Sequence, residues 1–544
     1  MQRNFKAFGN QIFDVAIIGG GITGSCIARD AARRGLSVAL VEKGDFSGGT
    51  SAGSTKLVHG GLRYLKSMEF GLIRESLAER RIWERIAPHM VYPMPFILPL
   101  QKASEKWVVG TGLTLYDLLS FDRNRLEDRD QHMPAHRSIT AAEARALEPS
   151  LAEARFDSAM LYYDCQMYSP ERLGLECLID AVAHGAVITN HAEAIGFDRA
   201  AGGIESVRIR DRLTGDDTRV RCRVAINAAG PWADRLLQLI DGTAGGHKLI
   251  RSKGIHIVTR ALTGRHALAV SQKGGHFFIV PWRDHSIVGT TDTVFTEEPD
   301  ALHVTPEEIA SFIAFVNEGL PGLGLDNDDV RYAYAGLRPL VDDGSSNSYN
   351  ASRKAEIVDH GAEGGPSNLL SAIGGKWTTS REIARRCVNL VARKLQAETR
   401  RCDTGEAPLP GAAGNHRARV RALGAARGDL APSTVEALAR NYGAMAEKVL
   451  AHAATDPTLL TTVSQAHPDI AAQVVHAVRA EMACTLEDVV FRRTGLGTLG
   501  PPEPAALERI AMLMGRELNW TDAEKQRQIA SIAWRYAPLA SGTA

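Results

Sequence analysis

The pattern of apolar positions begins with two short, continuous runs separated by a helix-like stretch. Residues 12–18 and 36–42 are rich in β-branched side chains, which is typical of strands buried on both faces of a parallel sheet. Between them, a Gly-rich turn leads into a helical stretch that reaches Arg34, and Gly35 is its stop signal. The chain is therefore predicted to start with a βαβ unit.

The pattern changes three times farther along the chain. Residues 73–87 have the amphipathic spacing of a helix. Between about 250 and 295, short β runs alternate with turns, which predicts antiparallel strands. Residues 368–395 return to a strand, a Gly-rich turn and a helix. After a Pro/Gly/Ala-rich linker at 403–415, Ala-rich helical segments continue nearly to the end.

The bulk composition excludes several classes of protein. A length of 544 residues indicates roughly three domains. Lys plus Arg and Asp plus Glu are both 63, so no overall charge attracts nucleic acid, and any basic site must be local. The seven cysteines are scattered and never form a C-x-x-C, which fits a reducing compartment and predicts neither a disulfide framework nor a metal site.

No segment has the length and apolar character of a membrane span, which needs roughly 18 apolar residues. The N-terminus lacks the features of a signal peptide. The most apolar run, 90–100, contains three prolines and is therefore predicted to be a loop or an edge segment. Residues 106–121 and the run 90–100 are candidates for contact with a membrane surface. Residues 106–121 look apolar and exposed, although burial in the core is an equal alternative for them.

Residues 19–24 match the G-x-G-x-x-G fingerprint of a dinucleotide site in its expected strand–turn–helix context. Gly19 makes the tight turn, Gly21 lets the backbone approach a pyrophosphate, and Gly24 allows close packing of helix on strand. Glu42 ends the next strand, where it is placed to accept hydrogen bonds from an adenosine ribose.

This fingerprint alone does not separate NAD from FAD. Two further Gly-rich turns, "NAAGPWAD" at 227–234 and "IGGKWTT" at 373–379, lie far away in the sequence. They predict a ligand that extends deep into the protein, as FAD does.

Several of these segments together resemble the FAD-dependent, quinone-linked glycerol-3-phosphate dehydrogenases. They are the opening "IIGGGITGSCIARDAARRG", the loop "STKLVHGGLRYL" at 54–65, "NAAGPW", "VPWRDHSIVGTTDT", "AGLRPL" and "IGGKWTT". The resemblance extends from about residue 10 to 400, with a helical tail like that of the family. No EF-hand loop is found, which disfavours the calcium-regulated mitochondrial type.

The resemblance implies an α/β fold with a Rossmann-type FAD-binding domain, an antiparallel β-rich substrate domain and a C-terminal helical domain. The expected FAD-binding domain is discontinuous, comprising 10–90, 150–240 and 335–400. The substrate domain takes 91–149 and 241–334, and the helical domain, whose helices indicate packing or homodimer contacts, takes 405–544.

The implied reaction is oxidation of sn-glycerol 3-phosphate to dihydroxyacetone phosphate, with hydride transfer to N5 of FAD. The electrons would pass to a quinone, and the protein would be cytoplasmic and bound peripherally to the inner face of the membrane. Such a reaction needs a base for the hydroxyl proton and cations for the phosphate. His256, on a predicted strand and pointing away from its apolar neighbours, is a candidate base, with a structural histidine as an equal alternative.

The substrate residues implied by the resemblance are Arg63, Tyr64, Arg338 and Lys376, and His256, Arg338 and Lys376 are the expected catalytic set. Lys376 is assigned either to the flavin or to the phosphate. The expected cofactor contacts are Gly19, Gly21, Gly24, Glu42, Ser51, Ser54, His59, Gly60, Gly61, Gly230, Gly374, Gly375, Lys376 and Thr378, with Thr55 as a further hydroxyl candidate.

Three alternatives stay open at this point. An amine or amino-acid oxidase of the same flavoprotein class would use Arg338 to hold a carboxylate. A glycerol-3-phosphate oxidase would keep the substrate and pass electrons to oxygen. A flavin-binding scaffold without turnover would hold the cofactor only.

Overall fold

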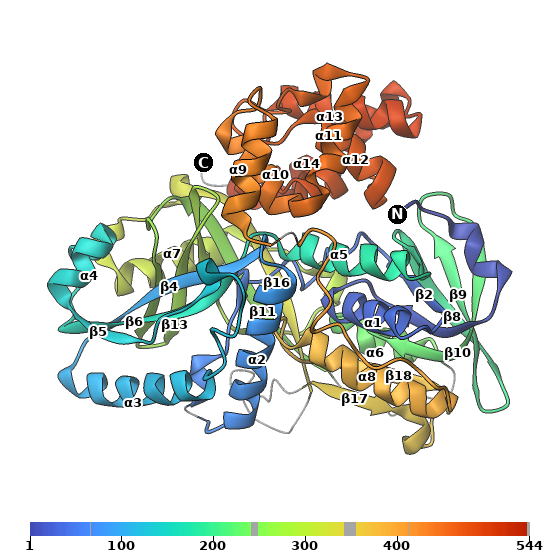
Figure 1. The fold of residues 1–544 in the computed structure, drawn as a ribbon, viewed down its shortest axis with the longest axis horizontal. Coiled ribbons are helices and arrows are strands. Elements are labelled where there is room, and N and C mark those ends of the chain that lie inside the picture. Colours follow the sequence, from blue (N-terminus) through green and yellow to red (C-terminus); the bar gives the residue numbers. More distant parts are fainter. Residues whose placement is uncertain (66, 241–248, 342–354, 413, 541–544) are drawn as a thin grey trace.

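A computed structural model of the chain describes residues 1–65, 67–240, 249–341, 355–412 and 414–540. Two large sheets lie side by side, and a cluster of helices from the end of the chain sits across them (Figure 1). This arrangement confirms the predicted fold class, with a mixed α/β unit, an antiparallel unit and a helical tail.

The first sheet has the order β17-β18-β10-β1-β2-β7 and contains the predicted βαβ unit. Its central strands are parallel, with Val15 opposite both Val38 and Val224. All but one of the residues of β1 are buried, as the continuous apolar run predicts, because helices cover the sheet. The bounds are β1 Phe13–Ile18, β2 Val38–Val41, β7 Val187–Thr189, β10 Asp217–Asn227, β17 Glu356–Asp359 and β18 Leu369–Ile373, with an antiparallel extension of β8 Ala192–Ala200 and β9 Gly203–Asp211.

Three helices pack on this sheet and on one another: α1 (Ile22–Arg33), α5 (Pro170–Ala183) and α8 (Ser380–Leu395). Because β1, β2, β10 and β18 are parallel, their carboxyl ends meet at one edge of the sheet. The turns that follow those ends are the Gly-rich turns singled out in the sequence, so the fold gathers them at that edge.

The second sheet has the order β15-β11-β14-β13-β12-β4-β6-β3, with β16 also on β11 and β5 on β6. All pairings in it are antiparallel except that of β4 with β12, as the short β runs predict. A core cluster lies between this sheet and α4 and α7. The bounds are β3 Leu57–Val58, β4 Val91–Leu100, β5 Arg137–Thr140, β6 Ser158–Met167, β11 Leu249–Arg260, β12 Ala267–Gln272, β13 Gly275–Trp282, β14 His285–Gly289, β15 Thr293–Phe295, β16 Val330–Val341, α4 Ala141–Leu147 and α7 Pro306–Gly319.

Strand β4 corrects the prediction that 90–100 is a loop or an edge segment. It lies between β6 and β12 and pairs with β6 along all ten residues. Its prolines, Pro93, Pro95 and Pro99, are all at odd positions, so their missing N–H groups fall on one side of the strand. The pairing with β12 covers only two residues, so few bonds are needed on that side.

Two further helices lie below this sheet, α2 (Phe70–Ile86) and α3 (Ala103–Leu119). They pack together through a small cluster that includes Tyr64, Leu77 and Tyr116. Among the described helices, none is both long and apolar enough to cross a bilayer.

The C-terminal segment forms its own core, which also touches β16 and α5. Its longer helices are α9 His416–Ala426, α10 Pro432–Tyr442, α12 Ala471–Glu481, α13 Pro504–Leu518 and α14 Asp522–Ala533, and a short π-helix, η13, spans Asp488–Arg493. The domain limits inferred from sequence remain a proposal. One finding bears on them: β6 belongs to the second sheet, although 150–240 was allotted to the cofactor domain.

Candidate active site

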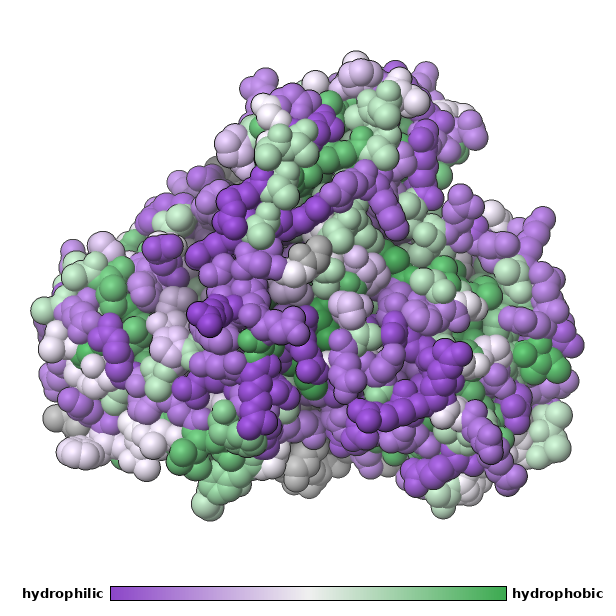
Figure 2. All heavy atoms as spheres, viewed as in Figure 1, coloured by the Kyte–Doolittle hydropathy of each residue, from purple (hydrophilic) through white to green (hydrophobic). Residues whose placement is uncertain are grey.

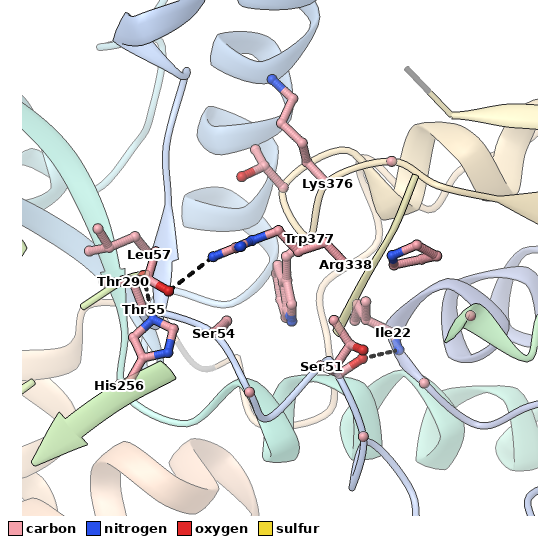
Figure 3. Close-up of a pocket in the computed structure, with 18 of the residues that line it drawn as sticks. Ile22, Ser51, Ser54, Thr55, Leu57, His256, Thr290, Arg338, Lys376 and Trp377 are labelled. Carbon is pink, nitrogen blue, oxygen red and sulfur yellow. Dashed lines mark hydrogen bonds between the residues drawn. The ribbon is translucent and has the colours of Figure 1, made fainter. Parts of the chain in front are cut away.

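A single large cavity of about 2280 Å³ runs from the carboxyl edge of the first sheet to the face of the second. Its walls come from both sheets, from α3 and from the C-terminal helices. Figure 3 shows one part of it, where residues from β11, β16 and the loops after β2 and β18 face one another.

The Gly-rich turn after β1 has the close contacts that its motif requires. Gly19 has a φ of +109°, and a Cβ there would lie 2.5 Å from the carbonyl oxygen of Ala228. A Cβ on Gly24 would lie 1.9 Å from the carbonyl oxygen of Gly19, which is closer than any side chain tolerates. Gly21 is the N-cap of α1 and has no side chain of its own to cap the helix, so this N-terminus can meet a ligand in the cavity at close range.

Two side chains support this turn. The Oγ of Ser51 accepts a hydrogen bond of 2.9 Å from the N–H of Ile22 (Figure 3). The carboxylate of Glu42 accepts hydrogen bonds from the N–H groups of Gly20 (2.7 Å) and Gly44 (2.8 Å). Burial raises the pKa of Glu42, and these two bonds oppose that shift. Because each carboxylate oxygen accepts more than one bond, Glu42 keeps capacity for a ribose hydroxyl.

At the other end, Arg338 on β16 is fixed by hydroxyl, carbonyl and carboxylate oxygens. Its Nη2 donates to Thr290 Oγ1 (2.9 Å), its Nη1 donates to Ser252 Oγ (3.1 Å), and both nitrogens donate to the carbonyl of Thr291. Its Nη1 also lies 3.9 Å from Oδ2 of Asp292, as a long ion pair. These contacts hold the guanidinium at the cavity wall, where a planar cation favours an anionic ligand.

His256 lies beside Arg338 and is almost fully buried, at 2% exposure. Its Nε2 is 2.9 Å from Thr55 Oγ1, and its ring stacks on Tyr334 with centroids 4.9 Å apart. On the opposite strand, a Cβ on Gly289 would lie 2.1 Å from the imidazole, so glycine makes room for the ring. The Nδ1 atom is buried and has no hydrogen-bond partner among the described residues.

Burial holds the pKa of His256 well below its ordinary value of 6.5, and the positive charges of Arg338 and Lys56 lower it further. The imidazole is therefore neutral at physiological pH. A neutral ring has a lone pair that can accept a proton, but burial and the two positive charges disfavour the protonated form, so the role of His256 as the base stays a prediction.

Lys376 lies in the loop before α8 and lines the cavity, and its side chain points away from Arg338 and His256 toward α2 (Figure 3). Its Nζ donates to Ser76 Oγ (2.6 Å) and lies 4.2 Å from the centre of the Tyr64 ring. Tyr64 is buried at 6% exposure and also lines the cavity. The side chain of Arg63 lies outside the described part of the structure.

Most of the other predicted cofactor residues also line the cavity: Gly19, Gly21, Glu42, Ser51, Ser54, His59, Gly61, Gly230, Gly374, Gly375 and Thr378. Gly24 and Gly60 stand behind its wall. The N–H of Gly60 donates to the hydroxyl of Tyr116 and to Asp164. The fold thus brings together segments that are more than 300 residues apart.

Sequence reasoning assigned no role to Thr290, Ser252 or Ser76, which hold Arg338 and Lys376 in place. It assigned Thr55 to the cofactor, whereas its hydroxyl contacts His256. The only signal in the sequence is the pair of threonines after a strand in "IVGTTD", and such a pair is common in ordinary turns.

The residues present fit FAD. A glycine turn without room for a Cβ, a helix N-terminus with glycine as its N-cap and an acidic side chain after β2 form a site for adenosine and pyrophosphate. From there the cavity continues along Gly230, Gly374 and Gly375 to Arg338 and His256, which suits a long cofactor.

Comparison with known proteins agrees with this geometry. Residues 14–381 match the family model "FAD dependent oxidoreductase", and residues 402–525 match "C-terminal domain of alpha-glycerophosphate oxidase". The chain is 34% identical to a glycerol-3-phosphate dehydrogenase of Synechocystis over 97% of both chains. It is also 34% identical to the human mitochondrial glycerol-3-phosphate dehydrogenase, over 95% of this chain and 72% of that one.

Among solved structures, the glycerol-3-phosphate dehydrogenase of Bacillus halodurans in complex with FAD has a TM-score of 0.76 and 28% identity, covering 97% of this chain and 95% of that one. The L-alpha-glycerophosphate oxidase of Mycoplasma pneumoniae, at 16% identity, 74% coverage of this chain, 99% of that one and a TM-score of 0.55, shares the fold. The chain belongs to the family of FAD-dependent glycerol-3-phosphate dehydrogenases.

Proposed function

We propose that this protein oxidises sn-glycerol 3-phosphate to dihydroxyacetone phosphate and passes the electrons to a membrane quinone. The observation that carries the proposal is the grouping of Arg338, Lys376 and His256 around one end of a cavity whose other end has a dinucleotide turn. Bound FAD would supply the hydride acceptor, at its N5 atom.

Arg338 is the proposed main contact for the substrate phosphate. Its fork of N–H donors suits paired hydrogen bonds to phosphate oxygens. Thr290 and Ser252 fix the fork in advance, so little side-chain entropy is lost when the anion binds. Lys376 is proposed to complete the substrate site together with Arg63 and Tyr64, which follow the Gly60–Gly61 pair.

The hydroxyl proton is proposed to reach His256 through Thr55. The Nδ1 of His256 is sealed in the protein, so Nε2 is the atom that can exchange a proton with the cavity. Thr55 Oγ1 stands at hydrogen-bond distance from that Nε2 and also lines the cavity. A hydroxyl in this position accepts the substrate proton as it donates its own to the imidazole.

The experiment that tests the substrate is an anaerobic titration of the purified holoenzyme, followed by flavin absorbance. Glycerol 3-phosphate should bleach the flavin, while amino acids and glycerol should not. Bleaching by an amino acid alone would identify an amino-acid oxidase, and a flavin inert to all of them would identify a scaffold. Reoxidation by a quinone analogue much faster than by oxygen separates the dehydrogenase from the oxidase.

The proposed membrane contact is an apolar patch formed by Met68, Phe70, Leu118 and Phe121, which are 42% to 73% exposed. Trp107 and Val108 continue it along α3, at 80% and 75% exposure. Figure 2 shows apolar surface at the lower edge of the molecule, below α2 and α3. Such a surface fits the interfacial region of a bilayer.

The cavity reaches this part of the molecule, because Val108, Val109 and Leu115 of α3 also line it. An apolar quinone could therefore pass from the bilayer to the cofactor without crossing water. Trp107→Asp with Leu118→Asp should reduce binding to lipid vesicles and quinone reduction, while flavin bleaching by substrate is retained. Leu213→Asp, at an exposed apolar position on the turn between β9 and β10, is the matched control. Unchanged vesicle binding by the double variant would reject this surface.

A further inference from the structure

The C-terminal helical domain touches the cofactor domain beside the turn that follows β2. The π-helix η13 carries Arg492 and Arg493, which both reach Asp45, three residues after Glu42. Asp45 is only 4% exposed, so this contact is shielded from water.

Four hydrogen bonds converge on the carboxylate of Asp45. Its Oδ2 accepts from Arg492 Nε and Arg493 Nη1, both at 2.7 Å, and its Oδ1 accepts from Arg493 Nη2 (3.0 Å) and Asn190 Nδ2 (2.9 Å). Hydrogen bonds to a charged group in a buried setting are the strong ones in proteins. Asp45 is therefore held firmly by the C-terminal domain.

The other end of the same loop is tied to the nucleotide turn. The N–H of Ser47 donates to the carbonyl of Gly20 (3.0 Å), and the N–H of Gly44 donates to Glu42 (2.8 Å). Loop 43–48 thus links the dinucleotide turn on one side to the C-terminal domain on the other. Only two residues separate Asp45 from Glu42 in the sequence, so a shift of Asp45 is expected to move Glu42 as well.

The hydrogen-bond network continues from Arg492 to the residue that precedes β8. Arg492 Nη2 donates to Asp488 Oδ1 (2.7 Å), and Asp488 Oδ2 is 3.0 Å from the Nε2 of His191, just before β8. Asp45, His191 and Asp488 also lie close enough together for a metal ion, but the two arginines already occupy the carboxylate oxygens. The cluster is therefore an ion-pair network between two domains.

The same domain also lines the cavity. Arg492, together with Thr485, Glu487, Gln528, Ser531 and Arg535, belongs to its wall, and so do Glu42, His191 and Glu193. Glu42 marks the adenosine end of a dinucleotide site. The C-terminal domain therefore shares the cavity wall with Glu42, His191 and Glu193.

We infer that the C-terminal domain is a working part of the FAD site: Arg492 and Arg493 position loop 43–48 through Asp45, and the domain closes the adenosine end. Cofactor binding and docking of this domain are then linked, so each strengthens the other. The inference rests on the cofactor orientation proposed above. It does not depend on which substrate or electron acceptor is used.

The first test compares two arginines of the C-terminal domain that each pair with a carboxylate. Arg492→Met loosens Asp45, whereas Arg479→Met breaks the pair of Arg479 with Glu517, which lies within the C-terminal domain and outside the cavity wall. Release of FAD from the diluted holoenzymes is followed by flavin fluorescence. Arg492→Met should release FAD about tenfold faster or more, and Arg479→Met within about twofold of wild type. Equal release rates in the two variants would overturn the inference.

The second test needs no variant and decides the matter if Arg492→Met fails to fold. Hydrogen exchange is measured on the wild-type full chain with FAD and after its removal. Amides of 485–494 and 43–48 should lose protection when FAD is removed, while those of α13 should not. Unchanged exchange in 485–494 would overturn the inference. Because neither readout involves glycerol 3-phosphate, a failure here leaves the proposed substrate untouched.

Discussion

Replacing Arg338 with alanine tests the proposed anion site most directly. The guanidinium donates hydrogen bonds to Ser252, Thr290 and the carbonyl of Thr291, and Asp292 lies 3.9 Å away as a long ion pair. The hydroxyls can turn to other acceptors when the arginine is lost, so the fold should be little affected. The binding of a doubly charged phosphate should suffer much more.

The expected magnitude follows from the two hydrogen bonds that a guanidinium fork gives to a phosphate. Each hydrogen bond to a charged group contributes about 1.5–3 kcal/mol, so the loss is roughly 3–6 kcal/mol. That corresponds to a fall of about 10²- to 10⁴-fold in kcat/KM for glycerol 3-phosphate. Arg338→Lys keeps the positive charge but loses the paired N–H donors, so its kcat/KM should lie between those of wild type and Arg338→Ala.

The assay is anaerobic stopped-flow reduction of the bound flavin over a range of substrate concentrations. Arg331→Ala, on the exposed start of the same strand, is the matched control, and flavin content per chain must equal that of wild type in all variants. If Arg338→Ala keeps kcat/KM within about threefold of wild type, Arg338 does not bind the phosphate and the argument fails.

Three other predictions concern Thr55 in the cavity, Gly24 in the dinucleotide turn and the buried Glu84 on α2. Thr55→Val should lower kcat by about 10- to 100-fold without loss of FAD, because the hydroxyl is needed to pass the proton to His256. Thr55→Ser should restore kcat, and equal rates for the Val and Ser variants would disprove the relay. Gly24→Ala should weaken FAD retention and cost about 1–3 kcal/mol of stability in chemical denaturation, since its Cβ would lie 1.9 Å from the carbonyl oxygen of Gly19. Burial raises the pKa of Glu84 to about 8, so its neutral form stabilises the fold fully below pH 4.5 and this contribution is lost as pH rises through about 8. Glu84→Gln should therefore gain stability relative to wild type with rising pH, and a constant difference would contradict this.

The parts of the fold that were predictable from sequence depend on local patterns. The apolar runs of β1 and β2, the helix that ends just before Gly35 and the short antiparallel strands all follow from the spacing of neighbouring residues. Strand β4 was not predictable in this way. Its prolines leave only one side of the strand with a full set of N–H groups, and it becomes a strand because β6 pairs with it along that side.

The same contrast applies to the site. The residue types of Arg338, His256 and Lys376 stood out locally, and the fold places all three around the cavity. The contact of Thr55 with His256 joins positions 201 residues apart, and nothing near either residue indicates it. The ion pairs of Asp45 with the C-terminal arginines join still more distant positions, so only the folded chain reveals them.

The order of strands in the first sheet has a consequence for biosynthesis. Strand β1, made first, receives its neighbour β10 only after residue 217, and β10 receives β18 only after residue 369. On the ribosome, a growing chain therefore carries an unpaired sheet edge through most of translation, and such edges are prone to aggregate. Loading of the flavin is a late event for the same reason, and chaperone supply and cofactor supply should both limit the yield of this protein when it is overproduced.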